Sequence, residues 1–112
     1  GSSLGGLLSY FAGVKAWPVF SRVLVFSPSL WVSSKTFGDA RDLATAPATR
    51  FYLFGGGRET KSMKSSLERL DATLRRHPNV QTQFSFDPEG RHEEARWARE
   101  FPKAAEWLFG SE

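Results

Sequence analysis

Hydrophobic positions follow two kinds of spacing along this chain, one typical of helices and one typical of buried strands. In residues 4–16, apolar side chains recur every three or four positions, which predicts an amphipathic helix that ends at Trp17 and Pro18. Residues 22–29 (RVLVFSPS) and 50–57 (RFYLFGGG) are apolar runs of strand length. Runs of this kind favour strands that are covered on both faces of a sheet.

The second half of the chain continues this alternation. Residues 61–77 predict a helix, and one of its faces carries Met63, Leu67, Leu70 and Leu74. Residues 80–86 alternate apolar and polar side chains, which predicts a third strand nearer an edge. Residues 93–109 predict a last helix, which Pro102 should kink or restart. Its inward-facing side chains should be Trp97, Phe101, Ala104, Ala105 and Leu108.

Strands that alternate with helices predict an α/β fold with a parallel sheet. We therefore expect about three parallel strands flanked by helices, in one domain covering residues 1–112. The apolar fraction of 40% and the charged fraction of 24% are those of an ordinary globular domain.

Charge and cysteine content narrow the classes of function. The 15 basic and 12 acidic residues give a net charge of +3 and are interleaved, as in RHEEARWARE, so no nucleic-acid partner is expected. The chain has no Cys, which excludes disulfides and thiolate chemistry. No apolar run approaches the ~20 residues needed to span a bilayer, and no membrane partner is expected. The cellular compartment of the protein stays open, and a cytoplasmic localisation is favoured over secretion.

The stretch GSSLG fits the pattern G-x-S-x-G, with Ser3 in the position of a nucleophile. This pattern needs a sharp strand-to-helix turn that exposes one serine, and the N–H of the next residue, Leu4, then points at a developing oxyanion. A linker is the alternative interpretation of a Gly-Ser-Ser start. A phosphate-binding loop is not predicted, because no Lys follows the glycines and G-x-G-x-x-G does not fit.

His92 is the candidate general base, because it follows the third predicted strand and precedes a helix. The alternative is a surface histidine in a charged loop. An acid that orients the imidazole is expected in the loop GGGRET, which offers Glu59, with Asp87 as a substitute. Glu59 could equally be a carboxylate that stabilises a helix start. Two histidines on different elements, with no Cys, predict no metal site.

Taken together, four stretches resemble the esterase family of α/β-hydrolases that contains siderophore trilactone esterases, such as enterochelin esterase, and S-formylglutathione hydrolase. The stretches are GSSLGGLLSYFAG, FSRVLVFSPSLWVS, RFYLFGGGRE and GRHEEARWAREFPKAAEWLF, and they cover nearly all of the chain. The resemblance implies a serine carboxylic-ester hydrolase without a cofactor, with Ser3 as nucleophile and His92 as general base. Some siderophore esterases work with Ser and His alone, so Glu59, Asp87 or no acid remain open.

The resemblance also implies where the substrate binds and how much of the fold is present. Four residues that follow a strand are expected to line the pocket of a small-molecule ester: Ser27, Ser29, Leu30 and Trp31. Trp31 would be its aromatic wall, with ordinary core packing as the alternative. The chain is expected to begin at the nucleophile elbow and to form the C-terminal half of an α/β-hydrolase. The expected partner is then the missing N-terminal half or a second copy. The competing hypothesis is a non-catalytic α/β fragment that associates through its exposed sheet edge.

Overall fold

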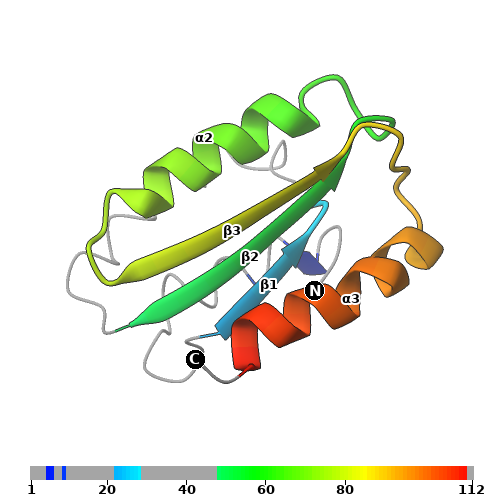
Figure 1. Cartoon of the computed structure of the whole chain (residues 1–112). Coiled ribbons are helices and arrows are strands. Elements are labelled where there is room, and N and C mark those ends of the chain that lie inside the picture. Colours follow the sequence, from blue (N-terminus) through cyan, green and yellow to red (C-terminus); the bar gives the residue numbers. More distant parts are fainter. Residues whose placement is uncertain (1–4, 7–8, 10–21, 29–47, 111–112) are drawn as a thin grey trace.

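The computed structural model describes residues 5–6, 9, 22–28 and 48–110. This part of the chain forms a three-stranded sheet with one helix on each face (Figure 1). The elements are, in chain order, β1 (Arg22–Phe26), β2 (Thr49–Gly56), α2 (Met63–Arg75), β3 (Val80–Asp87) and α3 (Glu94–Phe109).

The three strands are parallel and lie in the order β1-β2-β3. Phe26 pairs with Phe54, and Gly56 pairs with Asp87, so the strands end at the same edge of the sheet. All three arrowheads in Figure 1 point the same way. In open parallel sheets, residues that follow the carboxyl ends of the strands are the ones that form ligand sites.

Side chains of β2 supply both hydrophobic layers. Phe51 and Leu53 face α2, in a cluster that also contains Leu67 and Leu70. Tyr52 and Phe54 face α3, in a second cluster whose members from α3 are Ala104 and Leu108. This strand is therefore buried on both sides, which explains its continuous apolar sequence.

Most of the predicted elements described here are confirmed, and with them an α/β fold with a parallel sheet. The helix predicted over 61–77 is α2, and the predicted face of Met63, Leu67, Leu70 and Leu74 is buried. The third strand lies at the end of the strand order, as expected. The first strand is shorter than predicted and ends at Phe26, because Ser27 has a φ of 45° and leaves the extended conformation.

Helix α3 corrects one prediction. Phe101, expected to face inward, is 55% exposed, whereas Glu100 is 4% exposed and takes an inward position. Glu100 lies there because it accepts a hydrogen bond from the buried Tyr52. The helix does not restart at Pro102 but runs through it to Phe109. Apolar periodicity alone assigns the inward face wrongly where a buried hydroxyl needs a partner.

Glycines allow two loops to approach each other closely. A Cβ at Gly56 would collide with the backbone of Gly90, and a Cβ at Gly57 would collide with the backbone of Pro88. Two backbone hydrogen bonds join the loops. Gly57 N donates to Asp87 O at 2.7 Å, and Arg58 N donates to Gly90 O at 2.9 Å. The loop after β2 and the loop after β3 are therefore held backbone against backbone.

Candidate functional site

Glu59 and His92 meet beside the carboxyl ends of the strands. Glu59 lies in the turn after β2, and His92 lies in the loop between β3 and α3. His92 Nδ1 is 2.5 Å from Glu59 Oε1. The Glu59 side chain is 1% exposed and the His92 side chain is 43% exposed. The carboxylate is thus enclosed, while the imidazole that contacts it reaches the surface.

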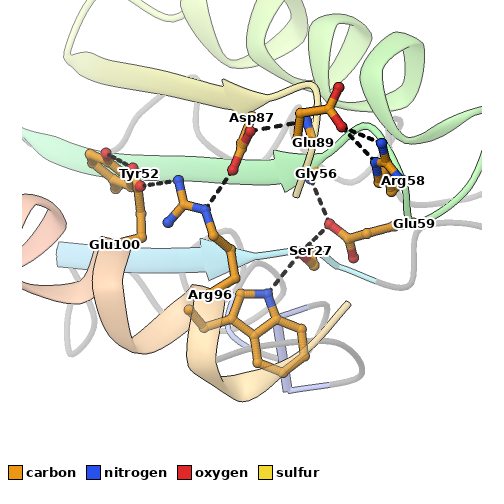
Figure 2. A network of polar contacts seen from close by, with 10 residues as sticks. Ser27, Tyr52, Gly56, Arg58, Glu59, Asp87, Glu89, Arg96 and Glu100 are labelled. Atoms are coloured by element: carbon orange, nitrogen blue, oxygen red, sulfur yellow. Dashed lines mark hydrogen bonds and ion pairs between the residues drawn. The ribbon is translucent and has the colours of Figure 1, made fainter. Parts of the chain in front are cut away.

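The second oxygen of Glu59 accepts two further hydrogen bonds. The backbone N–H of Gly56 donates to Oε2 at 2.5 Å, and the Ser27 hydroxyl donates to the same oxygen at 2.6 Å (Figure 2). Donors therefore surround both oxygens, as a buried carboxylate requires. Two of the donors come from the ends of β1 and β2, so the sheet itself fixes the orientation of the carboxylate.

Ser27 has a role that the sequence did not predict. It was expected to line a substrate pocket, but its side chain is enclosed and its hydroxyl lies against Glu59. Its Oγ also accepts a hydrogen bond of 2.9 Å from Trp97 Nε1. The contact between Ser27 and Glu59 follows from the strand order, because residues that follow two adjacent parallel strands lie side by side.

Asp87, the alternative acid, contacts other groups. Its Oδ2 accepts a hydrogen bond of 2.7 Å from Arg96 Nε, and its Oδ1 accepts one of 3.0 Å from the Glu89 N–H. The Arg96 guanidinium, followed by that backbone N–H, holds the pKa of Asp87 below its usual value. Of the two candidate acids, Glu59 is the one that the structure brings to His92.

Asp87 belongs to a second polar cluster, the closed network of Tyr52, Asp87, Arg96 and Glu100 (Figure 2). The Tyr52 hydroxyl donates to Glu100 Oε2 at 2.5 Å, and Arg96 donates to Glu100 Oε1 at 3.0 Å. Burial, followed by the bond to Glu100, raises the pKa of Tyr52. Burial also acts to raise the pKa of Glu100, but hydrogen bonds, that of Tyr52 first, outweigh burial and lower it. This network ties α3 to the sheet.

Several predicted site residues lie outside the described residues: Ser3, Leu4, Ser29, Leu30 and Trp31. The helix predicted over 4–16 is described only at Gly5, Gly6 and Ser9, which are helical. Within the described ranges, His, Asp and Glu side chains form no group of three or more that could hold a metal ion. No described helix is long and apolar enough to cross a membrane.

Comparisons with known proteins identify a fold. No family model and no curated protein sequence matches this sequence. Among solved structures, the chain is similar to the crystal structure of the BES protein from Bacillus cereus, with a TM-score of 0.83 and 21% sequence identity. The similarity covers 96% of this chain and 44% of that protein, so the chain spans less than half of its length. At this identity the comparison shows a related fold.

Proposed function

We propose that this chain carries the catalytic residues of a serine carboxylic-ester hydrolase with α/β-hydrolase architecture. In this proposal Ser3 is the nucleophile, His92 is the general base, and Glu59 is the acid that orients the base. The observation that carries it is the hydrogen bond of 2.5 Å between the enclosed Glu59 carboxylate and the exposed His92 ring.

The direction of this hydrogen bond decides what the imidazole can do. A carboxylate only accepts hydrogen bonds, so Nδ1 of His92 is the donor and carries a proton. In the neutral ring the lone pair is then on Nε2, the nitrogen on the other side. A base of this kind takes a proton from a hydroxyl at near-neutral pH.

The reaction follows from these assignments. Nε2 of His92 takes the proton of the Ser3 hydroxyl while Oγ attacks the ester carbonyl carbon. The backbone N–H of Leu4 donates to the oxyanion, and the imidazolium then gives its proton to the departing alkoxide. Water then loses a proton to the same nitrogen and attacks the acyl carbonyl carbon. The bond from that carbon to Ser3 Oγ breaks, the imidazolium returns its proton to Oγ, and the carboxylic acid leaves.

The position of the pair supports this proposal. Both side chains lie beside the carboxyl ends of parallel strands, where α/β proteins bind ligands. Their chain order, a serine followed by an acid and then a histidine, is that of the α/β-hydrolases. Ser29 and Trp31, which follow β1, are proposed to bind the ester. The chemistry needs no cofactor.

The test is hydrolysis of p-nitrophenyl acetate and butyrate by the protein, expressed with whatever further sequence its gene encodes. Ser3→Ala and His92→Ala should each lower kcat/KM about 10³-fold or more. The matched control is His77→Ala, which removes the other histidine of the chain and should leave kcat/KM within twofold. Equal losses in the two histidine variants, or wild-type rates for Ser3→Ala, would contradict the proposal.

A further inference from the structure

We propose that Ser27 and Trp97 form a positioning pair, which holds the Glu59 carboxylate and the His92 ring in the arrangement that keeps Nε2 available as a base. The proposal rests on the proposed function. Neither residue touches the reacting atoms in this account. Both act through the Glu59–His92 hydrogen bond, and they come from elements far apart in the sequence, the end of β1 and the first turns of α3.

The Ser27 hydroxyl can point in only one way. The indole N–H of Trp97 is a donor and never an acceptor, so Ser27 Oγ must accept along the 2.9 Å contact with it. The hydroxyl proton is then directed to Glu59 Oε2 at 2.6 Å. Trp97, Ser27 and Glu59 therefore form a chain of hydrogen bonds with one direction, ending on the carboxylate.

The backbone at Ser27 points to the same role for its side chain. Ser27 has a φ of 45°, a left-handed conformation that is less favourable for a residue with a Cβ than for glycine. Its N–H donates to Phe54 O at 2.6 Å, which fixes this bend against β2. A glycine would relieve the backbone but would leave Glu59 Oε2 and Trp97 Nε1 each without the hydroxyl partner.

Trp97 also contacts the base directly. Its ring and the His92 ring have centroids 4.8 Å apart and an interplanar angle of 87°, an edge-to-face contact. One indole thus limits rotation of the imidazole and, through Ser27, rotation of the carboxylate. The two partners of the Glu59–His92 hydrogen bond are held by the same side chain.

Loss of the Ser27 hydroxyl should change the His92 tautomer. Without it, Oε2 keeps only the Gly56 N–H, and the carboxylate can turn away from Nδ1. The imidazole then takes up more of the Nε2–H tautomer, which free histidine prefers, and the proton occupies the lone pair that the base requires.

The experiment is ¹⁵N NMR of the imidazole nitrogens with the rings in their neutral form, combined with ester kinetics. The probes are Ser27→Ala, which removes the hydroxyl, and Trp97→Phe, which keeps an aromatic ring but removes the N–H. The matched control is Ser65→Ala, which removes an exposed hydroxyl of α2 that donates to Ser62 O. The native protein and the control should show His92 mainly as the Nδ1–H tautomer.

Ser27→Ala should shift His92 toward the Nε2–H tautomer and lower kcat on the order of tenfold, with KM within twofold. Trp97→Phe should shift it in the same direction but less, because the Ser27 hydroxyl remains and only its direction is lost. If Ser27→Ala does not fold, Trp97→Phe decides. An unchanged tautomer in a folded variant of either residue overturns the proposal.

The tautomer measurement also separates this proposal from the proposed function. If the native protein hydrolyses no ester but the tautomer responds to Ser27→Ala, the hydrolase assignment fails and the positioning pair stands. If hydrolysis is confirmed but the tautomer does not respond, the positioning pair fails by itself.

Discussion

Two enclosed carboxylates lie beside the sheet, and their surroundings differ in one respect. The side chains of Glu59 and Glu100 are 1% and 5% exposed, and both accept hydrogen bonds at each oxygen. The partners of Glu100 are themselves enclosed, because Tyr52 is fully buried and the Arg96 side chain is 14% exposed. Glu59 instead contacts an imidazole that is 43% exposed.

We propose that this difference separates a structural contact, that of Glu100, from a functional one, that of Glu59. The closed network joins two side chains of α3 to Tyr52 of β2 and to Asp87 at the end of β3, and it ties the helix to the sheet. In the Glu59–His92 pair, the carboxylate is enclosed and held by hydrogen bonds, whereas the imidazole reaches the surface. An enclosed carboxylate that fixes a solvent-accessible imidazole is the arrangement that general-base catalysis needs.

The same substitution at the two carboxylates should give opposite results. Glu59→Gln should lower kcat/KM about 10³-fold, because the amide no longer holds the correct imidazole tautomer, and should change stability little. Glu100→Gln should leave kcat/KM of the folded protein within twofold and lower the free energy of unfolding by about 1–2 kcal/mol. Ester kinetics and urea unfolding of both variants measure this. Equal loss of activity in the two variants would contradict the comparison.

The closed network can be broken at its centre. Arg96→Met removes the cation between Asp87 and Glu100 and leaves an enclosed carboxylate without its charged partner, which should cost about 3 kcal/mol of unfolding free energy. Arg58→Met is the matched control, because its ion pair with Glu89 has side chains that are 52% and 72% exposed. That variant should change stability by less than about 1 kcal/mol. Similar losses in urea unfolding would show that the network does not anchor α3.

The approach of the two loops can be tested at Gly56. A methyl group there meets the backbone of Gly90, so Gly56→Ala should push the His92 loop away from the Glu59 turn. We expect a stability loss of about 2 kcal/mol and a clear fall in kcat/KM. Ser66→Ala is the control, because it changes the size of a side chain on α2, away from the two loops. It should leave kcat/KM unchanged. A Gly56→Ala protein with native stability and kinetics would show that the close approach is not needed.

Lowering the pH should reduce the stability that the closed network provides, because Asp87 and Glu100 become protonated. Both have a pKa that is lowered in the folded protein, so the unfolded chain binds more protons in acid. Their contribution to stability is complete above the usual values of 3.8 and 4.5 and is lost as pH falls below them. The free energy of unfolding of Asp87→Asn should therefore change less between pH 6 and pH 3 than that of the native protein. Urea unfolding at the two pH values measures this change. A difference as large as that of the native protein would contradict this assignment.

The spacing of apolar residues along the chain predicted the features that depend on residues close together in the sequence, such as the described helices and strands and the buried face of α2. The buried face of α2 repeats every three or four positions, and the apolar run of β2 is covered by helices on both faces, so both could be predicted. The loop that carries Glu59 and the loop that carries His92 were also predicted, because chain order assigns both to strand ends.

Contacts between distant residues set the rest. Glu100 faces inward because it meets the hydroxyl of Tyr52, 48 residues away, and no helical pattern shows this. The sequence favoured Glu59 and left Asp87 as a substitute, because the choice depends on Arg96, which binds Asp87. The contact of Ser27 with Glu59 was missed because the two residues are 32 positions apart, and their proximity is apparent only once the strand register is known.

The measurement that tests the central claim most directly is labelling by a fluorophosphonate, with the modified residue located by mass spectrometry. We predict one adduct, on Ser3, formed by the native protein and by His77→Ala, and formed at least 10²-fold more slowly by His92→Ala and Glu59→Gln. An adduct on another serine, or a Ser3 adduct that forms at the same rate in all four proteins, would contradict the account.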